Sequence, residues 1–252
     1  MQIVAVQIDM IWQDKRANHE KVRALLAQQV IEENALIILP EMFDTGFSMQ
    51  LDATAQTAER ESETFLREIA SQYKAAVMAG VVGPVSANRG TNEAVAFAPD
   101  GTQLVRYQKM QPFTPAGEDV KYGAGDKHCL FKWNGLKIAP FLCYDLRFPE
   151  VFRPAAMDGA ELLVVMACWP EVRSEHWVRL LQARAIENQA FTVGVNRCGS
   201  DPTLCYDGRS TAFDPLGISL FQADANEQVS LVNINAKEVR QWRNQFPALQ
   251  DI

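Results

Sequence analysis

A cysteine that ends an apolar run is the first residue whose type and position could support chemistry. Residues 136–142 predict a buried strand, and Cys143 follows them directly. Pro149 then permits a helix to begin, because proline is tolerated in the first turn of a helix. A thiol between a strand and the positive end of a helix can reach a cleft, and that end favours the thiolate form. The alternative is a buried cysteine that serves as a small apolar side chain.

Two other polar residues share this placement at the end of an apolar run. Glu41 follows residues 36–39, and Lys109 ends the run that begins at Thr102. Because strand ends in α/β folds line a common crevice, the three side chains are candidates for one site. A glutamate can accept a thiol proton, the thiolate can attack a carbonyl-type carbon, and a lysine can stabilise the resulting oxyanion. Taken singly, the glutamate could be a solvated loop acid and the lysine a surface residue.

The elements that must position these residues alternate along the chain. Short apolar runs predict strands at residues 3–8, 36–39, 76–82, 93–98, 102–109, 136–142, 162–167, 191–195, 211–213, 218–221 and 229–234. Apolar residues at helical spacing predict helices at residues 15–33, 59–73, 149–157, 174–188 and 236–244. The turn at Pro99-Asp100-Gly101 joins two of the strands into a hairpin. Together these elements predict a mixed sheet covered by helices.

Three segments depart from this regular pattern. Pro140 lies inside the strand before the cysteine, which predicts a bulge or a sheet edge there because proline cannot donate a ladder hydrogen bond. Residues 111–125 form a long connection, and long connections in compact domains are often functional. Residues 201–209 are expected to form a loop.

Composition narrows the class of protein. The chain has 252 residues, of which 48% are hydrophobic and 22% charged, and no linker or repeat divides it. A single domain over residues 1–252 is therefore expected. The net charge of −7 without a basic stripe argues against nucleic acid and membrane partners. The start of the chain does not resemble a signal peptide, and the five cysteines lack a metal-binding spacing, so we expect a cytoplasmic protein without a metal or cofactor.

Three sequence blocks resemble the signature blocks of the nitrilase superfamily of carbon–nitrogen hydrolases. They are LPEMFDTGF (39–47), RYQKMQPF (106–113) and FLCYDLRFPE (141–150). The resemblance implies an αββα sandwich of two mixed sheets flanked by helices, assembled as a homodimer or a larger homo-oligomer. It also implies that Glu41 is the general base, Lys109 stabilises the tetrahedral intermediate and Cys143 forms a thioester. The Tyr144 N–H would complete the oxyanion hole, and Glu118 would orient the lysine or the substrate.

Within this superfamily, residues 166–189 resemble the omega-amidase branch, whose substrates are ω-amides of small dicarboxylic acids such as 2-oxoglutaramate. Such a substrate carries a carboxylate at its far end, and an arginine can bind a carboxylate through two hydrogen bonds. Arg173 follows the strand at residues 162–167 and is the candidate for this role; the alternative is a surface arginine at a helix end. Phe43, Met166 and Trp169 are candidates for apolar pocket walls, and each could instead be core. Gln111 replaces a histidine found in many relatives.

Two other functions remain open at this point. A nitrilase or a carbamoylase would use the same chemistry on another small carbon–nitrogen substrate, and analysis of the products would separate these from an amidase. A non-catalytic interaction protein on a nitrilase-like scaffold is the third hypothesis. The presence of Glu41, Lys109 and Cys143 together argues against it, and selective alkylation of Cys143 would discriminate.

Overall fold

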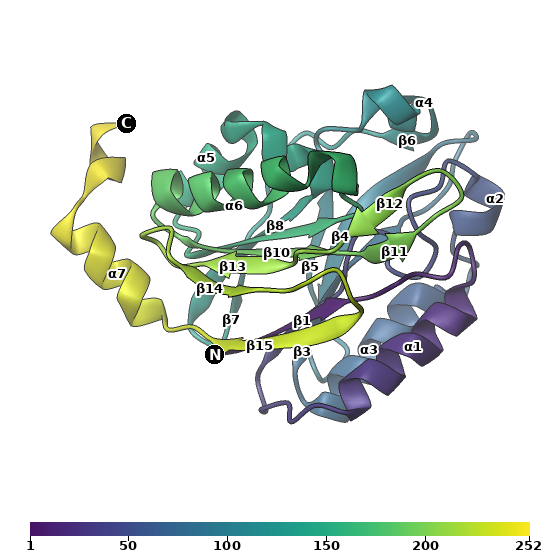
Figure 1. Ribbon diagram of the computed structural model, residues 1–252, viewed down its shortest axis with the longest axis horizontal. Coiled ribbons are helices and arrows are strands. Elements are labelled where there is room, and N and C mark those ends of the chain that lie inside the picture. The colour runs from purple at the N-terminus through teal and green to yellow at the C-terminus, as the bar shows by residue number, and fades with distance from the viewer.

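Two β-sheets face each other and carry helices on their outer sides. The computed structural model describes residues 1–252, and Figure 1 shows α1 (Lys15–Ala27) and α3 (Glu61–Tyr73) on one side of the sandwich. On the opposite side lie α5 (Pro149–Met157) and α6 (Ser174–Asn188). The expected αββα arrangement is therefore confirmed. None of the helices combines the length and apolar composition that crossing a membrane requires.

The first sheet has seven strands in the order β15-β1-β2-β3-β4-β5, with β6 paired to β4. Its strands are β1 (Gln2–Gln7), β2 (Leu36–Ile38), β3 (Ala76–Val82), β4 (Gly90–Phe97), β5 (Gln103–Gln108), β6 (Tyr122–Gly123) and β15 (Gln228–Asn233). Strands β1, β2 and β3 are parallel, and β4 is antiparallel to both β3 and β5. Consequently β2 and β5 run in the same direction, and their C-terminal ends reach the same edge of the sheet.

The second sheet has six strands in the order β14-β13-β10-β9-β8-β7. Its strands are β7 (Phe131–Trp133), β8 (Leu136–Leu142), β9 (Leu162–Ala167), β10 (Phe191–Asn196), β13 (Thr211–Phe213) and β14 (Ser219–Gln222). Strand β7 pairs with β8 only between Leu136 and Ile138. Pro140 lies beyond that pairing and faces a partner strand only on the β9 side. The expected sheet edge at this proline is confirmed.

Alternation along β1 explains how both faces of the first sheet are covered. Ile3 and Ala5 belong to the core cluster that includes the second sheet, whereas Val4 and Val6 belong to the cluster beneath α1 and α3. Successive side chains of a strand point to opposite faces, so a fully apolar strand can bury both faces. The continuous apolar runs in the sequence are the signature of this double burial.

The predicted end of the first helix is wrong, and one expected loop contains a strand. Helix α1 ends at Ala27 rather than at residue 33, and Val30 is exposed. The side chain of Gln2 holds this segment outside the helix, because it bonds the carbonyl of Val30 and the N–H of Glu32. The region expected as a loop at residues 201–209 includes half of a hairpin made of β11 (Cys198–Ser200) and β12 (Cys205–Asp207).

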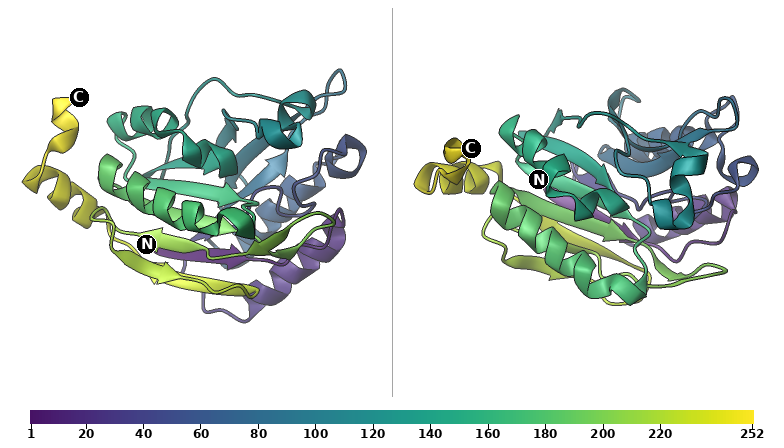
Figure 2. Two further views of the ribbon diagram at one scale, coloured as in Figure 1. Left: turned by 45° about the horizontal axis from the view of Figure 1, so that its top comes forward. Right: turned by 90° about the horizontal axis from the view of Figure 1, so that it is seen from above.

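The remaining elements are short or lie at one end of the molecule. They are α2 (Leu51–Thr54), α4 (Glu118–Lys121), α7 (Ala236–Gln245) and the 3₁₀ segments η1 (Thr114–Ala116), η2 (Cys143–Arg147), η3 (Glu171–Arg173) and η4 (Ala248–Asp251). Helix α7 extends from the end of the sandwich opposite to β11 and β12, as Figure 2 also shows. Helix α7 contributes no residue to the cavity described below.

Candidate active site

A buried lysine between two glutamates forms the centre of the site. The Lys109 Nζ atom lies 2.8 Å from Glu41 Oε1 and 2.8 Å from Glu118 Oε2, and all three side chains are at most 1% exposed. Burial alone would lower the pKa of Lys109, but the Glu118 and Glu41 carboxylates outweigh it and raise that pKa well above its ordinary value. The lysine is therefore a permanent cation over the neutral pH range.

The structure brings Glu41 and Lys109 together from two strands of the same sheet. Glu41 lies three residues beyond β2, and Lys109 directly follows β5. Glu118 comes from the long connection at residues 111–125, where it begins α4 and accepts a hydrogen bond from the Phe113 N–H. Thus Glu118 also ties this connection to the buried lysine.

The backbone turns sharply just after Glu41, and the neighbouring strand β3 comes very close to this turn. Met42 has a φ of 44°, a conformation that non-glycine residues seldom adopt. Gly80 on β3 lies against this turn, and a Cβ atom there would be 2.5 Å from the Glu41 Cα atom. Only glycine therefore allows β3 to approach the turn so closely.

We expect the Gly80→Ala variant to lose both stability and activity. The added methyl group must displace the Glu41 backbone, and overpacking of this kind costs about 1–3 kcal/mol. Displacing a catalytic group by roughly 1 Å can cost about 100-fold in rate. Thermal unfolding and kcat would be measured beside Gly123→Ala, whose new Cβ would meet nothing closer than 3.4 Å. Equal behaviour of the two variants would contradict this account of Gly80.

Cys143 occupies a second sharp turn, at the end of β8. Its φ is 42°, and it begins the segment η2. The buried Asp145 carboxylate fixes this turn by accepting hydrogen bonds from Leu142 N–H at 2.9 Å, Gln111 N–H at 2.9 Å and Tyr107 O–H at 2.7 Å. Since Tyr107 lies on β5 and Gln111 just after it, Asp145 joins the ends of β8 and β5.

The expected helix-end activation of Cys143 is wrong. Burial raises the pKa of the Cys143 thiol well above its ordinary value, and the Glu41 carboxylate raises it further, more than the Lys109 ammonium lowers it. The segment η2 separates the sulfur from α5, which begins only at Pro149. At rest Cys143 is therefore a thiol, so a base would have to take its proton if the sulfur were to act as a nucleophile.

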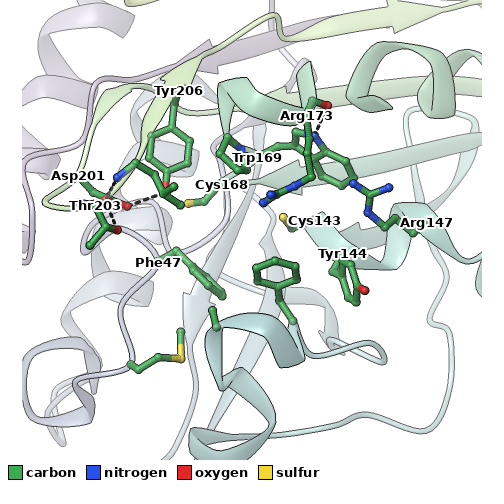
Figure 3. A pocket seen from close by; sticks show the side chains of 15 residues that line it. Phe47, Cys143, Tyr144, Arg147, Cys168, Trp169, Arg173, Asp201, Thr203 and Tyr206 are labelled. Atoms are coloured by element: carbon green, nitrogen blue, oxygen red, sulfur yellow. Dashed lines mark hydrogen bonds between the residues drawn. The ribbon is translucent and has the colours of Figure 1, made fainter. Parts of the chain in front are cut away.

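Cys143 opens onto a cavity of about 220 Å³. Figure 3 shows its sulfur beside Tyr144, Trp169 and the guanidinium groups of Arg147 and Arg173. The other lining residues are Phe47, Met49, Phe113, Ala116, Cys168, Pro170, Asp201, Thr203, Leu204 and Tyr206. The walls are mainly apolar, so the cavity suits a small organic molecule held by a few polar groups.

The two arginines supply the positive charge of the cavity. Arg173 lies 5.4 Å from the centre of the Phe113 ring, and Arg147 lies 4.7 Å from that of Trp169. Arg147 also donates a hydrogen bond to His176 Nδ1 at 3.2 Å. Burial and the nearby Arg173 charge lower the pKa of Arg147. Neither guanidinium forms an ion pair with a carboxylate of the chain, so both can bind an anion.

Other expected pocket residues lie elsewhere. Phe43 is fully buried in the core beneath α1 and α3, where its ring stacks on Phe65 at 5.8 Å. Its assignment to the pocket is therefore wrong, because the turn after Glu41 directs its ring into that core. Met166 is likewise buried and lines no part of the cavity. Trp169 does line the cavity, as expected.

Sequence reasoning missed three residues around this site. Arg147, four residues after Cys143, lines the cavity. Cys168 donates its backbone N–H to Glu41 Oε2 at 3.0 Å. Asn92 donates to both glutamates at 2.8 Å. An arginine so close in sequence to Cys143 was a usable signal, whereas nothing in the sequence distinguishes Asn92 from an ordinary strand residue.

Comparison with known proteins now identifies the family. The sequence model for carbon–nitrogen hydrolases matches residues 2–244. The chain belongs to the carbon–nitrogen hydrolase family. The curated relatives of this carbon–nitrogen hydrolase include the omega-amidase YafV of Escherichia coli (strain K12), 35% identical over 100% of this chain and 96% of that protein. The 2-oxoglutaramate amidase of Bacillus subtilis (strain 168) is 31% identical over 99% and 96%.

Solved structures of carbon–nitrogen hydrolases share the fold. XC1258 from Xanthomonas campestris, which carries an arsenic adduct in its active site, has a TM-score of 0.93 at 33% identity over 100% of this chain and 97% of that one. An amidase of the nitrilase superfamily from Nesterenkonia has a TM-score of 0.85 at 26% identity, covering 98% and 96%. A variant of that amidase has acrylamide added to its active-site cysteine. The predicted nitrilase-superfamily membership and fold class are confirmed.

Proposed function

We propose that this carbon–nitrogen hydrolase is a thiol amidase that releases ammonia from the ω-amide of a small dicarboxylic acid, such as 2-oxoglutaramate or 2-oxosuccinamate. The observation that carries the proposal is one cavity with Cys143 at its base and the unpaired cations Arg147 and Arg173 on its wall. A substrate with an amide at one end and a carboxylate at the other matches both features. Relatives named omega-amidase and 2-oxoglutaramate amidase support the same substrate class.

In the first half-reaction, Glu41 takes the proton of the Cys143 thiol while the sulfur attacks the amide carbon. The amide oxygen becomes an oxyanion, which the Lys109 ammonium and the Tyr144 N–H stabilise. Glu118 holds Lys109 in place through its ion pair. The tetrahedral intermediate then expels ammonia, which takes up the proton, and leaves an acyl group on the sulfur as a thioester.

In the second half-reaction, water attacks the thioester carbon. Glu41 accepts a proton from this water, and the same oxyanion donors act again. The carbon–sulfur bond breaks, the sulfur regains a proton, and the dicarboxylic acid leaves. The sum is amide plus water giving carboxylic acid plus ammonia, with the enzyme restored.

Recognition of the far carboxylate is assigned to Arg173, with Arg147 as a second cation. We expect Arg173→Ala to lower kcat/KM for an acidic ω-amide by about 10- to 100-fold, since a hydrogen bond to a charged group contributes about 1.5–3 kcal/mol. A neutral amide of similar length should lose less than about threefold. The control is Arg16→Ala on α1, whose side chain is 91% exposed. Equal losses on both substrates would remove Arg173 from carboxylate recognition.

Ammonia release across a panel of compounds tests the substrate class. The panel holds 2-oxoglutaramate, 2-oxosuccinamate, glutamine, asparagine and simple nitriles. We expect the two 2-oxo amides to be hydrolysed fastest, with the matching dicarboxylate as product. Turnover of nitriles, or carbon dioxide released from a carbamoyl compound, would instead favour the nitrilase or carbamoylase alternative.

The proposed enzyme works as a homodimer or a larger homo-oligomer, as the family resemblance implies, and in the cytoplasm, as the cysteine pattern favours. Exposed apolar side chains on the outer helices support a contact between copies: Met157 on α5 is 45% exposed and Ile186 on α6 is 51% exposed. Sedimentation at micromolar concentration tests the dimer, and a monomer at all concentrations would contradict it.

A further inference from the structure

One buried amide joins all three charged groups of the site. Asn92, on β4, is 1% exposed and donates through Nδ2 to Glu41 Oε1 at 2.8 Å and to Glu118 Oε1 at 2.8 Å. Its backbone carbonyl accepts the N–H of Lys109 at 2.9 Å. A single residue therefore touches both carboxylates and the strand end that carries the lysine.

The charges explain what such an amide can do. Two carboxylates face one ammonium, so the buried cluster keeps an excess of negative charge when all three groups are ionised. The two N–H groups of Asn92 lie between the carboxylates and offset their repulsion. The Asn92 Oδ1 atom is buried and has no hydrogen-bond partner, a cost to stability that the Nδ2 contacts must offset.

The position of the amide is rigid. Strand β4 is hydrogen-bonded on both sides, to β3 and to β5, and Asn92 is paired with Val82. The side chain is therefore carried by a strand with partners on both sides, whereas Glu118 comes from a connection and Glu41 from a turn. The spacing between the Glu41 and Glu118 carboxylates is therefore set by their hydrogen bonds to Asn92 and Lys109.

The hydrogen bonds also distinguish the two oxygens of Glu41. Oε1 receives Asn92 Nδ2 and Lys109 Nζ, which occupy both of its acceptor positions. Oε2 receives only the N–H of Cys168, so one of its acceptor positions stays open. The oxygen that can still accept a proton is Oε2.

We propose that Asn92 is a positioning residue that holds Glu41 by Oε1 and thereby leaves Oε2 as the oxygen that takes the Cys143 proton. This inference rests on the proposed roles of Glu41 and Cys143. Without the amide, the Glu41 carboxylate loses a donor that stabilises its charge and one of the three hydrogen bonds that fix its orientation. Proton transfer from Cys143 is then both misdirected and shifted in pH.

The test uses Asn92→Leu, which keeps the size of the side chain and removes both donors. We expect kcat to fall about 30- to 100-fold with KM changed by less than about threefold. The acid limb of the pH profile should move to higher pH, both for turnover and for alkylation of Cys143 by uncharged iodoacetamide. The matched control is Asn188→Leu on α6, because Asn188 is also buried, donates Nδ2 to a carbonyl and has an unpartnered Oδ1. The acid limb of the pH profile of the Asn188→Leu enzyme should not move.

A double-mutant cycle with Glu118→Gln separates positioning from simple loss of packing. With one carboxylate neutralised, the amide has less repulsion to offset, so Asn92→Leu should cost at least about threefold less in that background. Additive losses in kcat across the cycle would overturn the proposal. So would an Asn92→Leu enzyme whose acid limb has not moved and whose kcat is within about threefold of wild type. Asn92→Ser provides the same test if the leucine variant does not fold.

The iodoacetamide arm keeps this inference separable from the proposed function. Peptide mass spectrometry reports whether alkylation is at Cys143, whatever the natural substrate is. Wild-type enzyme that is alkylated elsewhere would contradict the proposed nucleophile. Alkylation at Cys143 with the same pH profile in wild type and Asn92→Leu would contradict only the role of Asn92.

Discussion

Replacing Cys143 with alanine is expected to lower kcat by roughly 10⁴-fold or more while the fold is retained. Removing the nucleophile of a covalent hydrolase removes the whole two-step route, and what remains comes from binding and oxyanion stabilisation. The side chain is half-buried, lines the cavity and packs against the core only in part, so its loss enlarges the cavity and leaves the rest of the core in place. Steady-state ammonia release and thermal unfolding would be measured together.

The control for this prediction is Cys198→Ala. Cys198 is buried and lies on β11, but it does not line the cavity, so its replacement should leave kcat within about twofold. Cys143→Ala enzyme with appreciable hydrolysis above a purified blank would refute Cys143 as the nucleophile. Loss of activity in both variants would point to a general effect of cysteine replacement.

Replacing Lys109 with methionine is expected to damage both catalysis and stability. The variant lacks the proposed oxyanion donor, and loss of one such donor costs about 10²- to 10³-fold in kcat. It also leaves Glu41 and Glu118 buried without their shared cation, and breaking a buried pair in this way costs about 3–5 kcal/mol. Chemical denaturation gives the loss in the free energy of unfolding, and ammonia release gives the loss in kcat.

A triple variant separates the two effects of the lysine. In Lys109→Met with Glu41→Gln and Glu118→Gln, no buried carboxylate remains unpaired, so most of the lost stability should return. Activity should not return, because the base and the oxyanion donor are both gone. A Lys109→Met enzyme as stable as wild type would show that the cluster is hydrated or protonated in solution, contrary to its burial here. Recovery of activity in the triple variant would contradict the assigned roles.

The backbone framework was largely predictable because its signals are local. Apolar runs marked β2, β5 and β8, and polar residues at their ends marked Glu41, Lys109 and Cys143. Their meeting depends on β2 and β5 running in one direction and on β8 lying in the facing sheet. Neither fact follows from a run of apolar residues, so convergence was inferred from the family resemblance. The structure shows the contact between Lys109 and Glu41, and the role of Cys143 beside them stays a prediction.

The wrong or missing predictions concern the direction, the ionisation and the contacts of side chains, which depend on the folded surroundings. Phe43 and Arg147 each lie close in sequence to a candidate catalytic residue, yet only Arg147 points into the cavity, because the turns after Glu41 and Cys143 differ. The ionisation of Cys143 depends on burial and on Glu41, which is far away in sequence. Asn92 was missed because its two acceptors come from other elements.

The central claim is that the Cys143 sulfur carries the acyl group during turnover. Wild-type enzyme mixed with 2-oxoglutaramate, quenched in acid within milliseconds and digested at low pH, can be analysed by peptide mass spectrometry. The account predicts the 2-oxoglutaryl group as a thioester on the peptide that contains Cys143, removable by hydroxylamine. The same acyl group on Cys168, or rapid turnover with no acylated cysteine at any quench time, would contradict it.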